Sequence, residues 1–158
     1  MTLEERVARF GAALAGDARG AIAAAGEGST SAKVAFARVQ VTLPKCDAGG
    51  SVWGPFEAPA SNVLHWLAYT GTTEVSVLRL GDFAFAFVPG EVVASLGVSW
   101  RAQLGGAIVT SLADDYVGYV ESPDFVEKEL GEAQRQYFGP SLAAVLVEGL
   151  LAADAATR

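Results

Sequence analysis

The stretch EVSVLRLGDFAFAFVPGE, residues 74–91, decides the fold of this chain. It holds two apolar runs, Glu74 to Leu80 and Phe83 to Val88, and the two residues between them, Gly81-Asp82, are a signal for a tight hairpin. The second run has phenylalanine on one face and small apolar residues on the other, which predicts a central strand covered on both sides. It ends at Pro89-Gly90-Glu91, where a helix is expected to begin.

Further strands are predicted on both sides of this hairpin. Residues 33–43 alternate between apolar and polar side chains, as a half-buried strand does, and residues 107–112 form another short apolar run. Helical spacing predicts helices over residues 92–104 and after the starts at Ser122-Pro123 and Gly139-Pro140. The sequence therefore predicts a single α/β domain over residues 1–158, with a mixed sheet of about four strands flanked by helices.

The remaining segments lie at the N-terminus and before the hairpin. Thr2 and Glu5 have the spacing of a capping box, which predicts a helix from there to Ala25. A long loop rich in glycine and proline follows at residues 44–60, and a short helix is expected at residues 62–70. A loop of that length in a compact domain is usually functional or contacts something outside it.

Composition excludes several classes of protein. The chain has 158 residues, of which 51% are hydrophobic and 18% charged, and this is typical of one globular domain. A net charge of −7 argues against binding to nucleic acids or anionic membranes. No segment is long and apolar enough to cross a membrane, and the N-terminus lacks the features of a signal peptide, so the chain as written is expected to be cytoplasmic. Cys46 is the single cysteine and is expected to be a loop or packing residue.

Two places carry candidate chemistry. Glu91 follows the carboxyl end of a buried strand, where open α/β sheets bind ligands, and a helix N-terminus there would keep it ionised as a metal ligand. The alternative is a glutamate that only caps the helix. The loop from Asp114 to Tyr119 follows the next strand and is either part of a site or a satellite of the core. His65 is the only histidine and is expected to be packed or at the surface.

Three segments in order resemble landmarks of the neutral (non-lysosomal) ceramidases. They are the strand, turn and helix at residues 79–91, the segment SLADDYVGY at residues 111–119, and the segment YFGP at residues 137–140. The resemblance runs from about Ala35 to Leu151 and covers the later part of that family's catalytic domain, leaving residues 1–30 outside it.

The resemblance implies a zinc-dependent amidase that cleaves the amide bond of ceramide. In that family two histidines, a glutamate and a tyrosine hold the zinc, and a serine attacks the carbonyl. By resemblance Glu91 takes the place of the glutamate and Tyr119 that of the tyrosine. A phenol is a reasonable ligand because the cation would depress its pKa well below the free value of about 10. Members of the family are often secreted.

The chain also departs from the family. The two zinc histidines and the serine belong to an earlier segment that has no counterpart here, so the ligand set is incomplete. Asp114 stands where the family usually has asparagine. Counted without gaps, Gly131 falls on a tyrosine that helps to stabilise the oxyanion.

Two functions therefore stay open. The chain is either the later part of a ceramidase-type hydrolase, inactive alone, whether as a fragment, a subunit of a split enzyme or an excised domain, or a non-catalytic, self-associating binding or structural domain derived from that scaffold. In the first case a partner chain or self-association could supply the missing half. The first predicts an apolar surface left for the missing portion, with residues 83–88 and 49–60 as candidates.

Overall fold

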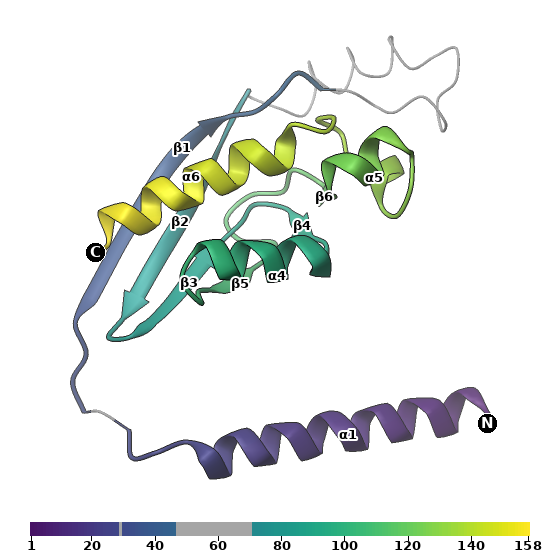
Figure 1. Cartoon of the computed structure of the whole chain (residues 1–158), viewed down its shortest axis with the longest axis vertical. Coiled ribbons are helices and arrows are strands. Elements are labelled where there is room, and N and C mark those ends of the chain that lie inside the picture. Colours follow the sequence, from purple (N-terminus) through teal and green to yellow (C-terminus); the bar gives the residue numbers. More distant parts are fainter. Residues whose placement is uncertain (29, 47–70) are drawn as a thin grey trace. The chain divides into compact units, whose positions relative to one another are not determined.

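The computed structural model describes residues 1–28, 30–46 and 71–158, which divide into two compact units, Met1–Ala32 and Lys33–Arg158 (Figure 1). Most of the predicted loop at residues 44–60 and the predicted helix at residues 62–70, with His65, lie outside the described residues. None of the helices in the described part of the chain is long and apolar enough to cross a membrane.

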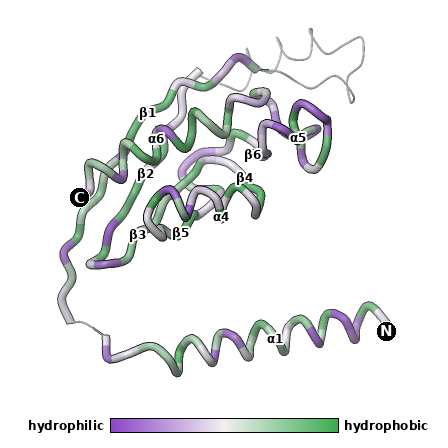
Figure 2. Tube along the Cα trace, in the orientation of Figure 1, coloured by the Kyte–Doolittle hydropathy of each residue, from purple (hydrophilic) through white to green (hydrophobic). Residues whose placement is uncertain are grey.

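The first unit is a single helix, α1 (Leu3–Ala24). The predicted capping box is confirmed: the Glu5 amide donates to the Thr2 hydroxyl oxygen (3.1 Å), and the Thr2 amide donates to the Glu5 carboxylate (2.7 Å). None of its residues is buried. Along its length apolar and polar residues alternate in patches (Figure 2).

The second unit is built on a four-stranded sheet in the order β1-β2-β3-β5. Its strands are β1 (Val34–Thr42), β2 (Thr72–Leu80), β3 (Phe83–Phe87) and β5 (Ile108–Thr110). The first three are antiparallel neighbours, and β5 lies parallel to β3. The predicted hairpin turns at Gly81, whose φ of 58° suits glycine. The prediction of an α/β fold with a mixed sheet is confirmed.

Helices α4 (Ala94–Gln103) and α6 (Leu142–Ala156) cover one face of this sheet (Figure 1). The core lies between these two layers, because side chains from both helices belong to one buried cluster with the strands. Gly149 lets α6 approach closely, since a Cβ there would lie 2.5 Å from Cγ1 of Val41 and 2.8 Å from Cγ2 of Val75. The largest buried members of the cluster include Leu142, Leu146, Leu150, Trp100 and Leu104.

Near the β2–β3 hairpin the opposite face of the sheet is apolar and largely open to solvent, whereas further along β1 and β2 it carries the polar side chains of Arg38, Gln40 and Glu74. The strand register aligns Phe36 with Leu78 and Phe85, and Val34 with Leu80 and Phe83, all on this face. Five large apolar side chains there are exposed over more than a third of their area: Val34, Phe36, Leu80, Phe83 and Ile108. We call these residues the open face.

The prediction that residues 83–88 form a strand covered on both sides is therefore wrong for one side. Ala84 and Ala86 are buried, whereas Phe83 is 66% exposed. The strand is central in its sheet, but both helices lie over its alanine side.

Two short strands and two helical turns complete the unit. Strand β4 (Glu91–Val92) pairs in parallel with β6 (Tyr119–Val120) in a separate two-stranded sheet. Helix α5 (Pro123–Glu127) begins after Ser122 as predicted, although the serine side chain makes no capping hydrogen bond. The 3₁₀ turn η2 (Ala133–Arg135) follows before α6.

Candidate metal-binding site

Glu91 and Tyr119 lie directly opposite each other in the β4–β6 ladder. The Glu91 amide donates to the Gly118 carbonyl oxygen (2.9 Å), and the Val93 amide donates to the Val120 carbonyl oxygen (3.2 Å). Residues at paired positions of a ladder project on the same side, so the carboxylate and the phenol are brought together although they are 28 positions apart. The structure thus joins the two residues that the sequence singled out.

The close approach of these two segments depends on Gly90. A Cβ at this position would lie 2.7 Å from Cγ2 of Val120 and 2.9 Å from the Gly118 carbonyl oxygen. On the same segment, the Pro89 carbonyl oxygen accepts a hydrogen bond from the Val117 amide (2.7 Å). A side chain at position 90 would therefore push Glu91 away from Tyr119.

Glu91 is not at a helix terminus, and this corrects the expectation that a helix begins at Pro89-Gly90-Glu91. Helix α4 begins at Ala94, and its N-cap residue is Val93, which makes no side-chain capping bond. The argument from the helix dipole and the alternative of a capping glutamate are both wrong. The physical reason is that the backbone at Glu91 pairs with β6 before the chain turns into the helix.

Electrostatics around Tyr119 keep its proton in place in the metal-free chain. A hydrogen bond with the Glu91 carboxylate is the largest cause that raises the pKa of Tyr119, followed by desolvation and the charges of Glu91 and Glu132. A hydrogen bond with Arg135 acts in the opposite direction. The Arg135 guanidinium carbon lies 5.8 Å from the centroid of the Tyr119 ring, within cation–π range.

The two aspartates of the 114–119 loop are not bonded to the Glu91–Tyr119 pair in the described part of the chain. The Thr73 hydroxyl on β2 donates to the Asp115 carboxylate (2.9 Å), and the Tyr116 amide donates to the other oxygen of the same carboxylate (2.7 Å). Asp114 has a positive φ of 68° and is exposed. The loop therefore contributes Tyr119 to the pair with Glu91, while Asp115 is bonded to Thr73 near the start of the internal strand β2.

Gly131 lies against a buried carboxylate. Glu121 is 4% exposed, and its two oxygens accept hydrogen bonds from the amides of Ser122 (2.6 Å) and Glu132 (3.2 Å). A Cβ on Gly131 would collide with the Glu121 carboxylate and come within 3.0 Å of the Phe125 ring. The φ of Gly131 is 58°, so a larger residue would also strain the backbone. In this conformation the position cannot carry a tyrosine.

Sequence reasoning missed three residues beside the pair. They are Arg135 at the Tyr119 ring, the buried Glu121, and Ser111, whose hydroxyl oxygen accepts from the Val92 amide (3.1 Å). Only Glu121 left a signal, as a single acid directly after the apolar segment that ends in Val120.

The donor atoms fit part of a metal site. A carboxylate and a phenol are oxygen ligands, and in this ladder they face the same point. Zinc sites, however, use three or four protein ligands, and the described residues hold no group of three or more histidine, cysteine, aspartate or glutamate side chains suited to a metal. The described part of the chain therefore does not provide a complete zinc site.

Among known proteins, this chain is similar to solved structures. No family model and no curated protein matches this sequence. A solved ceramidase complexed with C2 superimposes with a TM-score of 0.60 at 15% identity, covering 77% of this chain and 30% of that chain. The neutral ceramidase from Pseudomonas aeruginosa gives a TM-score of 0.54 at 14% identity, covering 78% of this chain and 29% of that chain. The chain therefore has the fold of one part of a neutral ceramidase and spans about 30% of the length of the ceramidases it matches.

Proposed function

We propose that this chain is the part of a ceramidase-type, zinc-dependent amide hydrolase that supplies two metal ligands, Glu91 and Tyr119, and that it is inactive alone. The observation that carries the proposal is the direct opposition of these two residues in the β4–β6 ladder, where the neighbouring Glu91 carboxylate raises the pKa of Tyr119. Glu91 has no capping role that would account for it otherwise.

In the assembled protein the remaining ligands and the nucleophile come from another segment. Zinc bound there would polarise the carbonyl of an acyl amide and activate the attacking oxygen. The residues of this chain prepare the ligand atoms. Glu91 and Arg135 compete at the phenol, because the carboxylate holds the Tyr119 proton and the guanidinium favours its release.

The open face supports the idea that something outside this chain completes the protein. Its five exposed side chains come from four strands of one sheet, and contiguous apolar surface of this kind usually marks an interface. We propose that the missing portion of the hydrolase covers this face. Self-association through the same face is the alternative.

A second candidate function is a binding or structural domain that has lost the chemistry. The observation in its favour is Gly131, which is pressed against the Glu121 carboxylate where, by resemblance, an oxyanion-stabilising tyrosine would stand. A descendant of this kind keeps the scaffold and holds no zinc.

A zinc titration of the chain followed by amide NMR separates the two candidates. Under the hydrolase proposal, zinc binds weakly but saturably and shifts the amides of Glu91 and Tyr119. Glu91→Gln and Tyr119→Phe are each expected to weaken that binding roughly tenfold or more, since each removes one of two ligands. Glu127→Gln on α5 removes an exposed carboxylate and serves as the matched control.

Glu91→Gln and Tyr119→Phe also show which result would contradict the assignment of these residues as zinc ligands. Zinc binding that is as strong in Glu91→Gln and Tyr119→Phe as in the unmodified chain contradicts the ligand assignment and leaves the second candidate. Each variant is expected to keep its fold, because both side chains are partly exposed.

A further inference from the structure

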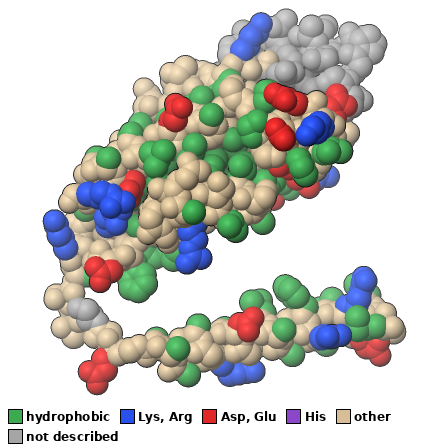
Figure 3. All heavy atoms as spheres, viewed as in Figure 1, with side chains coloured by type: hydrophobic (Ala, Val, Ile, Leu, Met, Phe, Trp, Pro, Cys, Tyr) green, Lys and Arg blue, Asp and Glu red, His purple; other side chains and the backbone are tan. Residues whose placement is uncertain are grey.

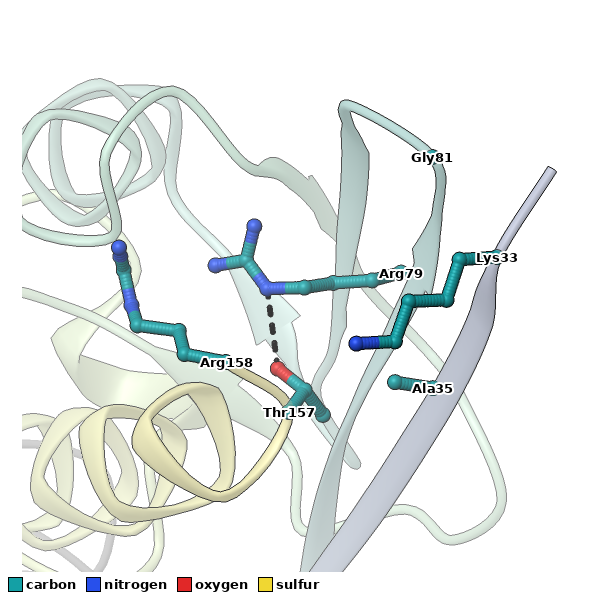
Figure 4. A pocket seen from close by; sticks show the side chains of 6 residues that line it. All are labelled: Lys33, Ala35, Arg79, Gly81, Thr157 and Arg158. Carbon is teal, nitrogen blue, oxygen red and sulfur yellow. Dashed lines mark hydrogen bonds between the residues drawn. The ribbon is translucent and has the colours of Figure 1, made fainter.

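A cavity lies at the hairpin end of the main sheet, away from Glu91. It has a volume of about 280 Å³ and is lined by Lys33, Ala35, Arg79, Gly81, Thr157 and Arg158 (Figure 4). These residues come from the start of β1, the β2–β3 hairpin and the end of α6. Strand β3 begins at this hairpin and ends at Phe87, four residues before Glu91, so the cavity and the candidate metal site lie beyond opposite ends of that strand.

The strand register brings the basic residues into the cavity. Ala35 pairs with Arg79, and side chains alternate along a strand, so Lys33, Ala35 and Arg79 belong to the same face of the sheet. The Gly81 amide donates to the Lys33 carbonyl oxygen (2.9 Å), which holds Lys33 against the hairpin. Ala35 has only a methyl group, and in Figure 4 the Lys33 side chain extends between Arg79 and Ala35 toward Thr157.

The Arg79 side chain is held in place by residues at the C-terminal end of α6. Its Nε donates to the Thr157 hydroxyl oxygen (3.0 Å), and its Nη2 donates to the Asp154 carboxylate. The Thr157 hydroxyl donates in turn to the Asp154 carbonyl oxygen (2.8 Å). Arg158 reaches the second oxygen of Asp154 with Nε (3.0 Å) and Nη2 (2.7 Å). Asp154 and Thr157 are buried, so this anchor is preorganised.

The cavity carries a surplus of positive charge. Asp154 is the one carboxylate in the network, and it is shared by two guanidinium groups. Lys33 makes no ion pair within the described part of the chain, so the side chains that line the cavity or bond to its lining comprise three cations and one carboxylate, that of Asp154. Lys and Arg side chains gather at this end of the unit (Figure 3). The whole chain has a net charge of −7, so this surplus is local.

We propose that this cavity binds a phosphate-type oxyanion, either free inorganic phosphate or the phosphate group of a larger molecule. Lys33 supplies the unpaired charge, and Arg79, whose Nε and Nη2 are bonded to Thr157 and Asp154, offers its remaining nitrogen, Nη1, from a guanidinium that is held in place. The alternative is that the arginines only cap the C-terminal turn of α6, where cations are favourable. That alternative accounts for Arg79 and Arg158 but assigns nothing to Lys33 or to the space beside Ala35.

The test is a titration with inorganic phosphate at constant ionic strength, followed by the amide signals of Ala35, Gly81 and Thr157. The proposal expects saturable shifts of these signals. Lys33→Gln is expected to weaken binding roughly tenfold because it removes one charge-assisted contact, whereas Lys33→Arg keeps most of it. Ala35→Leu fills the cavity without changing charge and is expected to weaken binding at least as much.

Arg101→Gln is the control, because it removes one cation from the exposed side of α4 and changes the net charge by the same amount. Shifts that do not saturate, or a loss in Arg101→Gln equal to the loss in Lys33→Gln, overturn the proposal and leave general electrostatic attraction. A second titration, with glycerol phosphate, decides the source: binding as tight as that of inorganic phosphate supports a phosphate group on a larger molecule, and much weaker binding supports the free ion.

Discussion

The two faces of the four-stranded sheet differ in how far their apolar side chains are buried. Under α4 and α6 the side chains interdigitate, and Leu142, Leu146 and Leu150 are 0% exposed. On the open face Phe36 is 55% exposed and Phe83 is 66% exposed. Burial on the helix side accounts for the folding of this unit, and the open face contributes little to it. The difference teaches that the helix-covered face carries the stability of this unit, while the apolar side chains of the other face add little to it.

The largest test of this comparison is a pair of truncations. Leu146→Ala on the covered face is expected to cost about 2–5 kcal/mol of unfolding free energy, because it removes transfer energy and leaves a cavity. Phe83→Ala on the open face is expected to cost about 0.5 kcal/mol or less, because its ring is mostly in water. Urea unfolding of the two variants measures both. Equal costs would show that the open face is covered in solution.

A smaller test concerns association through the open face. Phe83→Glu is expected to lower the self-association or partner binding of the chain several-fold, because it places a charge in an apolar interface. Analytical ultracentrifugation over a range of concentrations measures the change. Phe125→Glu, which alters an exposed phenylalanine on α5, is the matched control. An unchanged mass distribution in Phe83→Glu would remove the open face from the assembly proposal.

Much of the fold was predictable because its signals are local. The alternation in residues 33–43 and the Gly81-Asp82 turn fix β1, β2 and β3, and the Thr2–Glu5 capping box fixes the start of α1. What the sequence could not show is which face of β3 the helices cover, because both faces are apolar and the choice depends on where the later helices pack.

The sequence singled out Glu91 and Tyr119 by resemblance, but it did not predict the strand pairing that brings them together. Strand β4 is two residues long and is defined by its pairing with β6. A segment this short has no alternating hydrophobic pattern by which the sequence could predict it. The Pro-Gly-Glu sequence before an apolar run looks like a helix start, and this led to the wrong placement of Glu91. The position of Arg135 near Tyr119 depends on the path of the chain through η2, which has no sequence signature.

A third test, with a smaller expected effect, concerns the contact between Tyr119 and Glu91. The raised pKa of Tyr119 means that the folded metal-free chain keeps the phenol proton above pH 10, where an unfolded chain releases it. Stability is therefore expected to fall as pH rises above 10. In Glu91→Gln the pKa of Tyr119 is expected to move down towards its ordinary value, which NMR of the tyrosine ring carbons measures. An unchanged pKa would contradict the contact between the two side chains.

The most direct test of the central claim is the zinc content of the purified chain, by elemental analysis, together with its mass in solution. The account predicts that the monomer holds no stoichiometric zinc, and that any stoichiometric zinc appears only in an oligomer or a complex and is lost in Glu91→Gln. Stoichiometric zinc in a monomer, retained in Glu91→Gln, would contradict the claim that this chain is one part of a larger metal-dependent hydrolase.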